Sequence, residues 1–401
     1  MRTILFVDDE KPVLEGLQRM LRPMRKEWTM FFVESGGAAL ELLESQAVDV
    51  IISDMRMPVM DGVQLLSEVR LRFPKIIRFA LSGHSDSEML LESVKATHQF
   101  LAKPCDAETL KETVSRALAL DNLLRREDLN KIVTSIDALP SLPLLYAEIM
   151  NEVSSNAGTL AHVGEIVSKD ISMTLKLLQL VNSAFFGLRT HVESPAQAVS
   201  LLGLDVIRGL VLTTKVFFEF DQHKLPLNIN SLFEHSKLVG VLAKKIAVAE
   251  LLDRKSSDHA LMAGMLHDIG KLILAGSLTH EYKQIQEISK QKSIPLWQAE
   301  QQQLGCTHGE IGAYLLGLWG FPNSIVEAVA FHHHPQQAAG EEFTPLTAVH
   351  IANVILQSGD QGTNNIPLDN IYIERLGLRE HIPDWLYLRD ELLKKVDEGN
   401  E

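Results

Sequence analysis

Acidic residues that follow short apolar runs could form a site for phosphoryl transfer. Asp8 and Asp9 follow the first run, and Asp54 follows the third. Carboxylates that meet in one pocket repel one another unless a divalent cation lies between them, and oxygen ligands suit Mg²⁺. One carboxylate could then attack a phosphorus atom, while the metal and a lysine neutralise the transferred group. Lys103 and the hydroxyl of Ser82 each follow a later run and could contact that group.

A second set of candidate ligands lies in the other part of the chain. Its members are His235, His267, Asp268, His308, His332, His333 and Asn353. The consecutive pair His267 and Asp268 offers one nitrogen and one oxygen donor, and such mixed ligation suits a catalytic metal better than a closed structural zinc. Fe, Mn and Zn are the candidate ions. A second interpretation stays open, in which the run from His332 ends a helix and its imidazoles bind the last carbonyls.

The elements that must position the acidic residues are predicted from the pattern of residues 1–105. Apolar runs at residues 4–7, 30–33, 48–53, 77–81 and 100–102 alternate with helical spacing at 14–21, 38–43, 63–69 and 89–94. Strands that alternate with helices at this pace predict a parallel sheet with helices on both faces. Functional side chains on such sheets collect at the carboxyl ends of the strands. Asp8, Asp9 and Asp54 therefore meet if the first and third strands are neighbours.

From residue 107 the periodicity becomes helical, and it persists to about residue 356. The charged cluster at residues 125–128 marks the exit from the first domain. The Leu-Pro-Ser-Leu-Pro segment at residues 139–143 interrupts the helical pattern, because each proline disfavours helix at the residue before it. Ser141 can cap a new helix there. Residues 385–396 are expected to form a terminal helix. The predicted fold class is α/β plus all-α.

Composition excludes several classes of function. The chain has 401 residues, 46% of them hydrophobic, and a formal net charge of −14. Both parts of the chain carry more acidic than basic residues, so we expect no direct binding to nucleic acid. Cys105 and Cys306 are too few for a disulfide framework. We find neither a signal peptide nor a stretch long enough to span a membrane, so a reduced, cytoplasmic protein without membrane association is expected.

Residues 1 to about 122 resemble the receiver domain of two-component response regulators. The matching motifs are residues 6–10, 53–62, 81–83 and 103–104, in the order and at the spacing of that family. The resemblance implies a flavodoxin-like domain whose Asp54 accepts a phosphoryl group from a sensor histidine kinase. It also implies the other roles: Asp8, Asp9, Asp54 and the backbone carbonyl of Arg56 bind Mg²⁺, Lys103 contacts the phosphate, Ser82 is the hydroxyl switch and Phe100 is the aromatic switch.

Residues 139–335 resemble the HDOD domain, an all-helical module related to the HD superfamily of metal-dependent phosphohydrolases. The matching motifs are residues 139–143, 175–187 and 198–203. In most of that family the metal ligands are degraded and the domain acts through protein–protein interaction, whereas this chain retains candidate ligands. Asn353 stands where the HD signature has an aspartate, and a neutral amide is a poorer metal ligand. The Gly-Tyr-Pro element of the branch that hydrolyses cyclic-di-GMP is absent.

The expected organisation is a receiver domain at 1–122, a helical linker at 123–138, an HDOD domain at 139–335 and a helical C-terminal extension at 336–401. In the favoured hypothesis, phosphorylation of Asp54 is transmitted through the linker, and the HDOD domain binds a downstream signalling protein. The helical stretch at residues 107–136, with its interrupted apolar stripe, also allows a homodimer. The alternative is a receiver-gated, metal-dependent phosphohydrolase that acts on a nucleotide or cyclic dinucleotide. A further group of histidines, which includes His98, His162 and His259, has no partner pattern and is expected at the surface or in loops.

Overall fold

The computed structural model confirms an N-terminal parallel sheet followed by a mostly helical region. It describes residues 2–82, 96–119, 127–134, 140–141, 148–149, 151–153, 158–182, 192, 194–212, 218–219, 225–338, 342–358 and 367–398. By compactness the chain divides into two units. The first comprises residues 1–220 together with 317–320, and the second comprises residues 221–316 together with 321–401.

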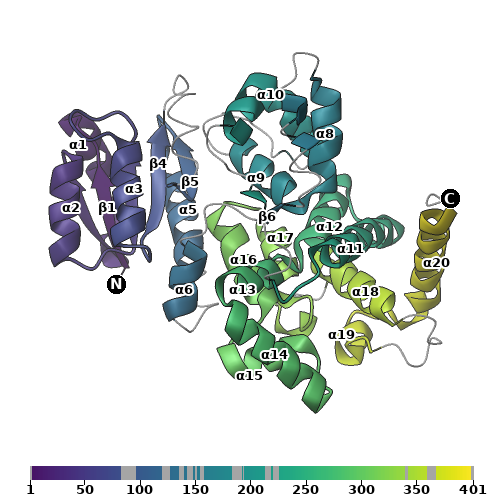
Figure 1. Ribbon diagram of the computed structural model, residues 1–401. Coiled ribbons are helices and arrows are strands. Elements are labelled where there is room, and N and C mark those ends of the chain that lie inside the picture. The colour runs from purple at the N-terminus through teal and green to yellow at the C-terminus, as the bar shows by residue number, and fades with distance from the viewer. Residues whose placement is uncertain are drawn as a thin grey trace. The chain divides into compact units, whose positions relative to one another are not determined.

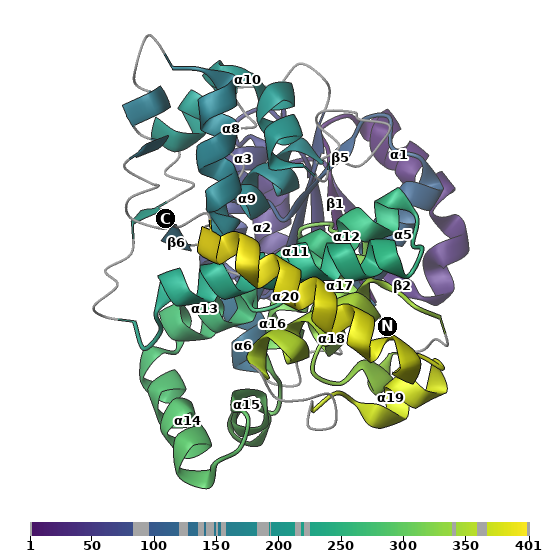
Figure 2. The same cartoon turned by 90° about the vertical axis from the view of Figure 1, so that its right-hand side faces the viewer.

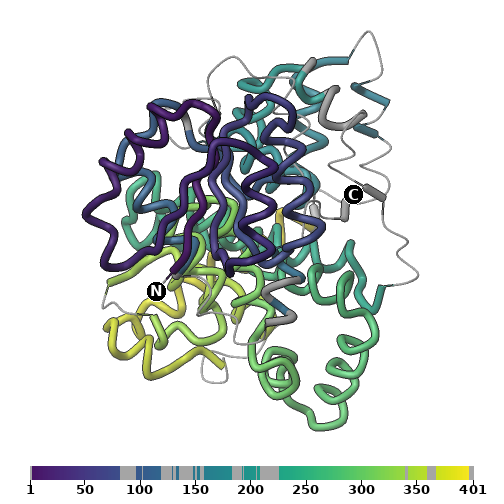
Figure 3. The backbone as a smooth tube through the Cα atoms, turned by 90° about the vertical axis from the view of Figure 1, so that its left-hand side faces the viewer, coloured from purple at the N-terminus to yellow at the C-terminus, as the bar shows by residue number. Residues whose placement is uncertain are grey.

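The sheet confirms all the apolar runs that were expected to be strands. Its members are β1 (Arg2–Val7), β2 (Trp28–Val33), β3 (Val50–Asp54), β4 (Ile77–Ser82) and β5 (Gln99–Ala102). The five strands are parallel in the order β2-β1-β3-β4-β5. Figure 3 traces the backbone of this part of the chain in purple and blue. The first and third strands are therefore neighbours, and Val7 of β1 pairs with Ser53 of β3. This register places Asp8 and Asp54, the next residue along each strand, side by side at the carboxyl edge.

Helices connect these strands, as predicted (Figure 1). They are α1 (Lys11–Met20), the 3₁₀ turn η1 (Arg22–Lys26), α2 (Gly36–Ser45) and α3 (Gly62–Arg72), and α5 (Ala107–Ala119) follows β5. The side chain of Ser35 accepts a hydrogen bond from the amide of Ala38, and that of Asp61 from the amide of Gln64, so each caps the helix that follows it. The helix expected at 89–94 lies outside the described residues.

The rest of the first unit, where the structure describes it, consists of helices and one short strand pairing. Its elements are α6 (Glu127–Thr134), β6 (Pro140–Ser141), α8 (Leu160–Lys169), α9 (Ile171–Val181), α10 (Pro195–Leu212) and β7 (Phe218–Glu219). The two-residue strands β6 and β7 pair in parallel, which the sequence pattern did not predict. Residues 125–126, the helix that Ser141 was expected to cap and residues 183–187 of the HDOD-like motif lie outside the described residues.

The second unit is built from packed helices, and the cluster of candidate metal ligands belongs to it. The helices are α11 (Ile229–Ala249), α12 (Arg254–Leu266), α13 (Ile269–Ser277), α14 (Thr279–Lys292), α15 (Leu296–Leu304), α16 (His308–Leu318), α17 (Asn323–Phe331), η5 (Pro335–Gln337), α18 (Pro345–Gln357), α19 (Asn370–Arg375), η7 (Arg379–His381) and α20 (Ile382–Glu398). The terminal helix expected at 385–396 is confirmed as α20, which lies against α11 and α18 (Figure 2). In the described part of the chain, no helix combines the length and the apolar character needed to cross a bilayer.

Candidate functional site

The carboxyl edge of the sheet brings the predicted acidic residues together. Carboxylate oxygens of Asp8, Asp9 and Asp54 all lie within 4.8 Å of one another. Asp8 is fully buried and Asp54 is 8% exposed, whereas Asp9 is exposed. Three oxygen donors at this spacing, one of them open to solvent, suit a hard divalent cation such as Mg²⁺ that keeps water among its ligands.

Lys103 bridges the two buried carboxylates. Its Nζ lies 2.7 Å from Oδ2 of Asp8 and 2.5 Å from Oδ1 of Asp54. Burial lowers the pKa of Lys103, but the hydrogen bonds to Asp54 and Asp8 outweigh that effect, and the pKa is raised above its usual value. The ammonium group is therefore held charged beside the oxygens of Asp54, where it could neutralise an incoming phosphoryl group.

The environment of Asp54 is set by burial and by a close backbone approach. Burial raises the pKa of Asp54, and the hydrogen bonds from Lys103 and the Arg56 amide oppose that rise. The Arg56 amide donates to Oδ2 of Asp54 over 3.1 Å, so Arg56 lies beside the acceptor as expected; the role of its carbonyl stays a prediction. A Cβ on Gly62 would lie 2.2 Å from the Asp54 carbonyl oxygen, so this position requires glycine.

The two expected switch residues lie on the neighbouring strands. Ser82 is the last residue of β4 and pairs with Ala102 of β5. Phe100 lies within β5, where it pairs with Ala80 and is 7% exposed. Ser82 is thus at the same edge of the sheet as Asp54, and Phe100 is two residues further from that edge.

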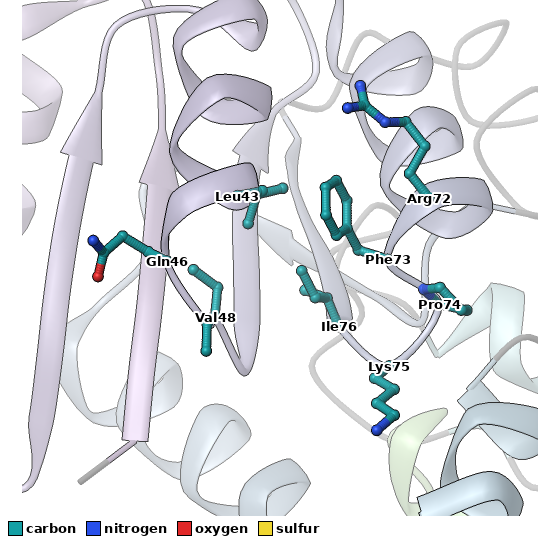
Figure 4. A pocket seen from close by; sticks show the side chains of 9 residues that line it. Leu43, Gln46, Val48, Arg72, Phe73, Pro74, Lys75 and Ile76 are labelled. Carbon is teal, nitrogen blue, oxygen red and sulfur yellow. The ribbon is translucent and has the colours of Figure 1, made fainter.

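Two hollows open at opposite ends of the receiver sheet. One of about 450 Å³ is lined by Val13, Leu17, Met20, Leu81, Lys103, Pro104 and Cys105. The other, of about 330 Å³, lies where β3 and β4 begin, and Figure 4 shows Leu43, Val48, Phe73 and Ile76 among its lining side chains. Only the first of these two hollows includes a residue of the acidic site, namely Lys103.

In the second unit, all seven predicted ligand residues come together, from three helices and from the turns that follow α12 and α17. His235 Nε2 lies 3.0 Å from Oδ1 of Asn353. Asp268 contacts His267 Nε2 at 3.4 Å and His308 Nε2 at 3.1 Å. His308 Nε2 is also 3.1 Å from His333 Nε2, and the ring centroid of His332 lies 5.0 Å from that of His267. The ligand atoms form two groups, each within 4.8 Å: His235 with His267 and Asp268, and His308 with His332 and His333.

Three of the imidazoles are oriented by a hydrogen bond at Nδ1. His267 Nδ1 lies 2.6 Å from the carbonyl oxygen of Gly264, and His332 Nδ1 lies 2.8 Å from that of Val329. His308 Nδ1 lies 2.6 Å from Oε2 of Glu300. His332 therefore does meet a carbonyl of its own helix end, as the alternative interpretation expected, but only through Nδ1. Each ring directs its Nε2 toward the cluster.

The cluster contains buried nitrogens that form no hydrogen bond. Nε2 of His267 and Nε2 of His332 are both buried and have no hydrogen-bond partner. A buried polar atom without a partner loses its hydration free energy, and a bound cation would compensate that loss.

The protonation states of the cluster also suit a cation. Burial, and then His267 and His308, lower the pKa of His332 well below its usual value. Burial alone would raise the pKa of Asp268, but His267 and Lys271 hold it well below the usual range. A neutral imidazole and an ionised carboxylate are the protonation states that bind metal, so His332 and Asp268 fit a cation.

Some residues of the cluster were not found from the sequence. Glu300 is fully buried and binds His308, yet it lies in a glutamine-rich stretch of α15 with no ligand pattern. His350 is 3% exposed, and its Nδ1 lies 2.8 Å from the carbonyl oxygen of His332. Lys271, by contrast, stands close to Asp268 in the sequence, and its ammonium donates to Oδ2 of Asp268 at 2.7 Å.

The expectation for the further histidines was wrong for His259, which is buried within α12, whereas His98 does lie in a loop, before β5, but is buried there. His98 is 2% exposed: its Nδ1 accepts the Arg78 amide at 3.0 Å, and its Nε2 lies 2.8 Å from the carbonyl oxygen of Thr134. His259 is 6% exposed and lies 2.6 Å from the hydroxyl of Ser324. Both imidazoles are buried because a partner from another element satisfies them, which the local sequence does not indicate.

Comparisons with known proteins identify both parts of the chain. The family model described as "Response regulator receiver domain" matches residues 4–115, and the model described as "HDOD domain" matches residues 139–335. An uncharacterized protein of Treponema pallidum is 26% identical over 264 residues, which is 63% of this chain and 49% of that protein. The hydrogenase transcriptional regulatory protein HoxA of Cupriavidus necator is 34% identical over 155 residues, 38% of this chain and 31% of that protein. The chain thus spans half or less of these two relatives.

Solved structures of similar proteins are also found. The MmoQ response regulator from Methylococcus capsulatus is 25% identical, with a TM-score of 0.45, over 62% of this chain and 98% of that chain. An HDOD domain protein from Geobacter sulfurreducens is 22% identical, with a TM-score of 0.35, over 71% of this chain and 99% of that one.

Proposed function

The chain carries a receiver domain followed by an HDOD domain, as response regulators with a phosphorelay role do, and we propose that Asp54 accepts the phosphoryl group from a sensor histidine kinase. The observation that carries this proposal is the position of Lys103, whose ammonium lies 2.5 Å from Asp54 and 2.7 Å from Asp8. A cation held beside a partly exposed carboxylate can compensate the charge of a transferred phosphoryl group.

Mg²⁺ is the metal that the receiver site would hold. Asp8, Asp9 and Asp54 supply the side-chain oxygens, and the Arg56 carbonyl is proposed as the remaining protein ligand. When bound, the metal supplies positive charge to the phosphoryl oxygens. The chain itself presents the Asp54 carboxylate and keeps the Lys103 ammonium charged. Ser82 and Phe100, on β4 and β5, are proposed to move in response to phosphorylation.

The experiment for this function is phosphorylation by acetyl phosphate in the presence of Mg²⁺. Wild-type protein is expected to be labelled at one site, and Asp54→Asn to abolish the label. Asp61→Asn is the matched control, because asparagine can still cap α3 and the label should persist. Full labelling of Asp54→Asn would remove Asp54 as the acceptor.

We propose that the output of the HDOD domain is binding to a downstream signalling protein. The proposed division is a receiver at 1–122, a linker at 123–138, an HDOD domain at 139–335 and a C-terminal extension at 336–401. The amide of Asn353 at the position of the HD aspartate supports interaction rather than turnover, because it cannot balance metal charge as a carboxylate does.

The orphaned nitrogens of His267 and His332 favour a second candidate, a metal-dependent phosphohydrolase acting on a nucleotide or cyclic dinucleotide. Fe, Mn or Zn would be held by the histidines and Asp268, and it would supply Lewis acidity. Elemental analysis of purified protein tests this: stoichiometric metal that is lost in His267→Ala, but retained with His280→Ala at an exposed position, supports the site. Metal-free protein with no phosphodiesterase activity would leave only the interaction output.

A further inference from the structure

Glu300 is a buried acid that neither candidate function uses. Its side chain is fully buried in α15, and an isolated carboxylate there would cost several kcal/mol in lost hydration. Three groups offset that cost. Oε2 accepts the backbone amide of His308 at 2.8 Å and contacts His308 Nδ1 at 2.6 Å, while the hydroxyl of Tyr282 donates to Oε1 over 3.3 Å.

The geometry determines which nitrogen of His308 carries its proton. A carboxylate only accepts hydrogen bonds, so the Nδ1 that lies 2.6 Å from it must carry the hydrogen. In the neutral imidazole the other nitrogen, Nε2, then holds the lone pair. That atom lies 3.1 Å from Nε2 of His333, to which it is hydrogen-bonded, inside the candidate metal cluster. It is also 3.1 Å from Oδ1 of Asp268, but that oxygen forms no hydrogen bond, so the contact does not require a hydrogen on Nε2.

We propose that Glu300 is a positioning residue for the candidate metal centre: it fixes His308 in the Nδ1–H tautomer, so that Nε2 faces the cluster as a ligand atom. Histidine ligands of metals commonly donate their second ring N–H to a carboxylate or a carbonyl. In this cluster His267 and His332 use backbone carbonyls, whereas His308 uses Glu300. The role of His308 as a metal ligand rests on the second candidate function, whereas the assignment of its tautomer does not depend on that function.

The same cluster explains why only His308 needs a carboxylate. His267 and His332 each follow the end of a helix, α12 and α17, and each reaches the carbonyl oxygen three residues earlier. His308 is instead the first residue of α16, so no earlier turn of its own helix offers a carbonyl oxygen. Glu300, from another helix, supplies the acceptor for both its ring and its amide.

The test measures the tautomer first and the metal second, on the full-length chain labelled with ¹⁵N-histidine. Nitrogen NMR of metal-free protein at pH 9, with the His308 signals assigned from His308→Asn, is expected to show the Nδ1–H form. Glu300→Gln keeps an acceptor oxygen and should retain that form. Glu300→Met removes the acceptor and should convert His308 to a mixture or to the Nε2–H form. An Nε2–H His308 in wild-type protein, or an unchanged Nδ1–H form in Glu300→Met, would overturn the inference.

The second measurement is the affinity for Zn²⁺ and Mn²⁺ in competition with a chelator. Substitution of such outer partners weakens metal binding by about 10–100-fold, so Glu300→Gln is expected near the lower value and Glu300→Met near the upper one. Tyr282→Phe and the exposed Gln303→Ala, which leave the His308 contact in place, should bind as wild type does. Wild-type protein that binds neither ion yet shows the Nδ1–H form would refute the metal centre and keep the tautomer assignment. Unchanged affinity in Glu300→Met would refute the positioning role in a metal centre that exists.

Discussion

The ammonium group of Lys103 is the residue-scale feature on which the receiver site depends. It is 26% exposed and lies between Asp8, which is almost completely buried, and Asp54, which is 12% exposed at its side chain. Two carboxylates this close repel each other, so the lysine stabilises the fold in the absence of any metal. The same group is the one proposed to contact the phosphoryl oxygens.

Lys103→Met should therefore destabilise the receiver domain, because it leaves a buried carboxylate without its partner. The expected loss in free energy of unfolding is about 3 kcal/mol, the lower figure for breaking a buried ion pair. Added Mg²⁺ should recover part of the loss by binding the same oxygens. Urea denaturation with and without Mg²⁺ measures both effects, with the exposed Lys111→Met as control. Equal midpoints for Lys103→Met and wild type would contradict this account of the site.

His98 predicts a pH dependence of stability. Burial, and then Arg78, lower the pKa of His98 well below its usual value, so the folded protein keeps this imidazole neutral. The unfolded chain takes up a proton near the usual pKa of about 6.5. The folded state therefore binds fewer protons, and the stability contributed by His98 is present above that value and lost as the pH falls below it.

The measurement is the melting temperature at pH 7.5 and pH 5.5 for wild type and His98→Gln. Glutamine can still donate to the Thr134 carbonyl but does not titrate. The variant is expected to lose less stability between the two pH values than wild type does. An identical loss in both proteins would show that His98 does not contribute to the pH dependence.

At the scale of elements, the candidate metal cluster depends on how closely α13 approaches α16. A Cβ on Gly270 of α13 would lie 1.9 Å from the carbonyl oxygen of His308, and 3.0 Å from the amide nitrogen of Gly312. The contact partner is backbone, which cannot move aside as a flexible side chain can. The backbones of α13 and α16 are therefore in close contact at Gly270.

Gly270→Ala should consequently destabilise the second unit by about 1–3 kcal/mol, the usual cost of overpacking. It should also displace His308 and so reduce any bound metal. Gly16→Ala in α1, where an added Cβ meets no atom within 4 Å, is the control and should be neutral or slightly stabilising. Thermal melting and metal content measured on the same samples separate the two effects. A Gly270→Ala protein with wild-type melting would contradict the close packing.

How far the elements could be predicted differs between the two parts. The strands of the receiver and the acids at their ends follow from local patterns, since apolar runs of three to six residues alternate with helical spacing. The donors around His267 could be identified by residue type, but their grouping could not, because it depends on packing of α11, α12, α16, α17 and α18. Glu300 could not be found, because a glutamate followed by three glutamines is typical of an exposed helix face.

The same limit explains why the burial of His98 could not be predicted. Its burial depends on Arg78, which is 1% exposed and donates to the carbonyl oxygens of Ala96, Ile76 and Thr134. The contact with Thr134 joins β4 to the end of α6, more than fifty residues away in sequence. No periodicity in the neighbourhood of His98 reports a contact of that kind.

At the scale of the whole molecule, the two candidate sites lie in different compact units and share no residue. Substitutions at separate sites with no common partner have nearly independent effects. Asp54→Asn should therefore leave the metal content unchanged, and His267→Ala should leave labelling by acetyl phosphate unchanged. Elemental analysis and phosphorylation assays on both variants check this. Loss of labelling in His267→Ala would show that the variant disturbs the receiver as well.

Helix α9 has no solvent-facing side: all eleven of its residues are buried, including Lys176 and Gln179. The Lys176 ammonium lies 4.4 Å from the centre of the Trp319 ring, and Gln179 donates to the His98 carbonyl oxygen. An amide in such a helix can meet water only when the surrounding unit opens. In heavy water these amides should retain their protons longer than those of α10, whose Gln197 and Leu201 are exposed. The rate at which these amides exchange therefore reports how often the first unit opens.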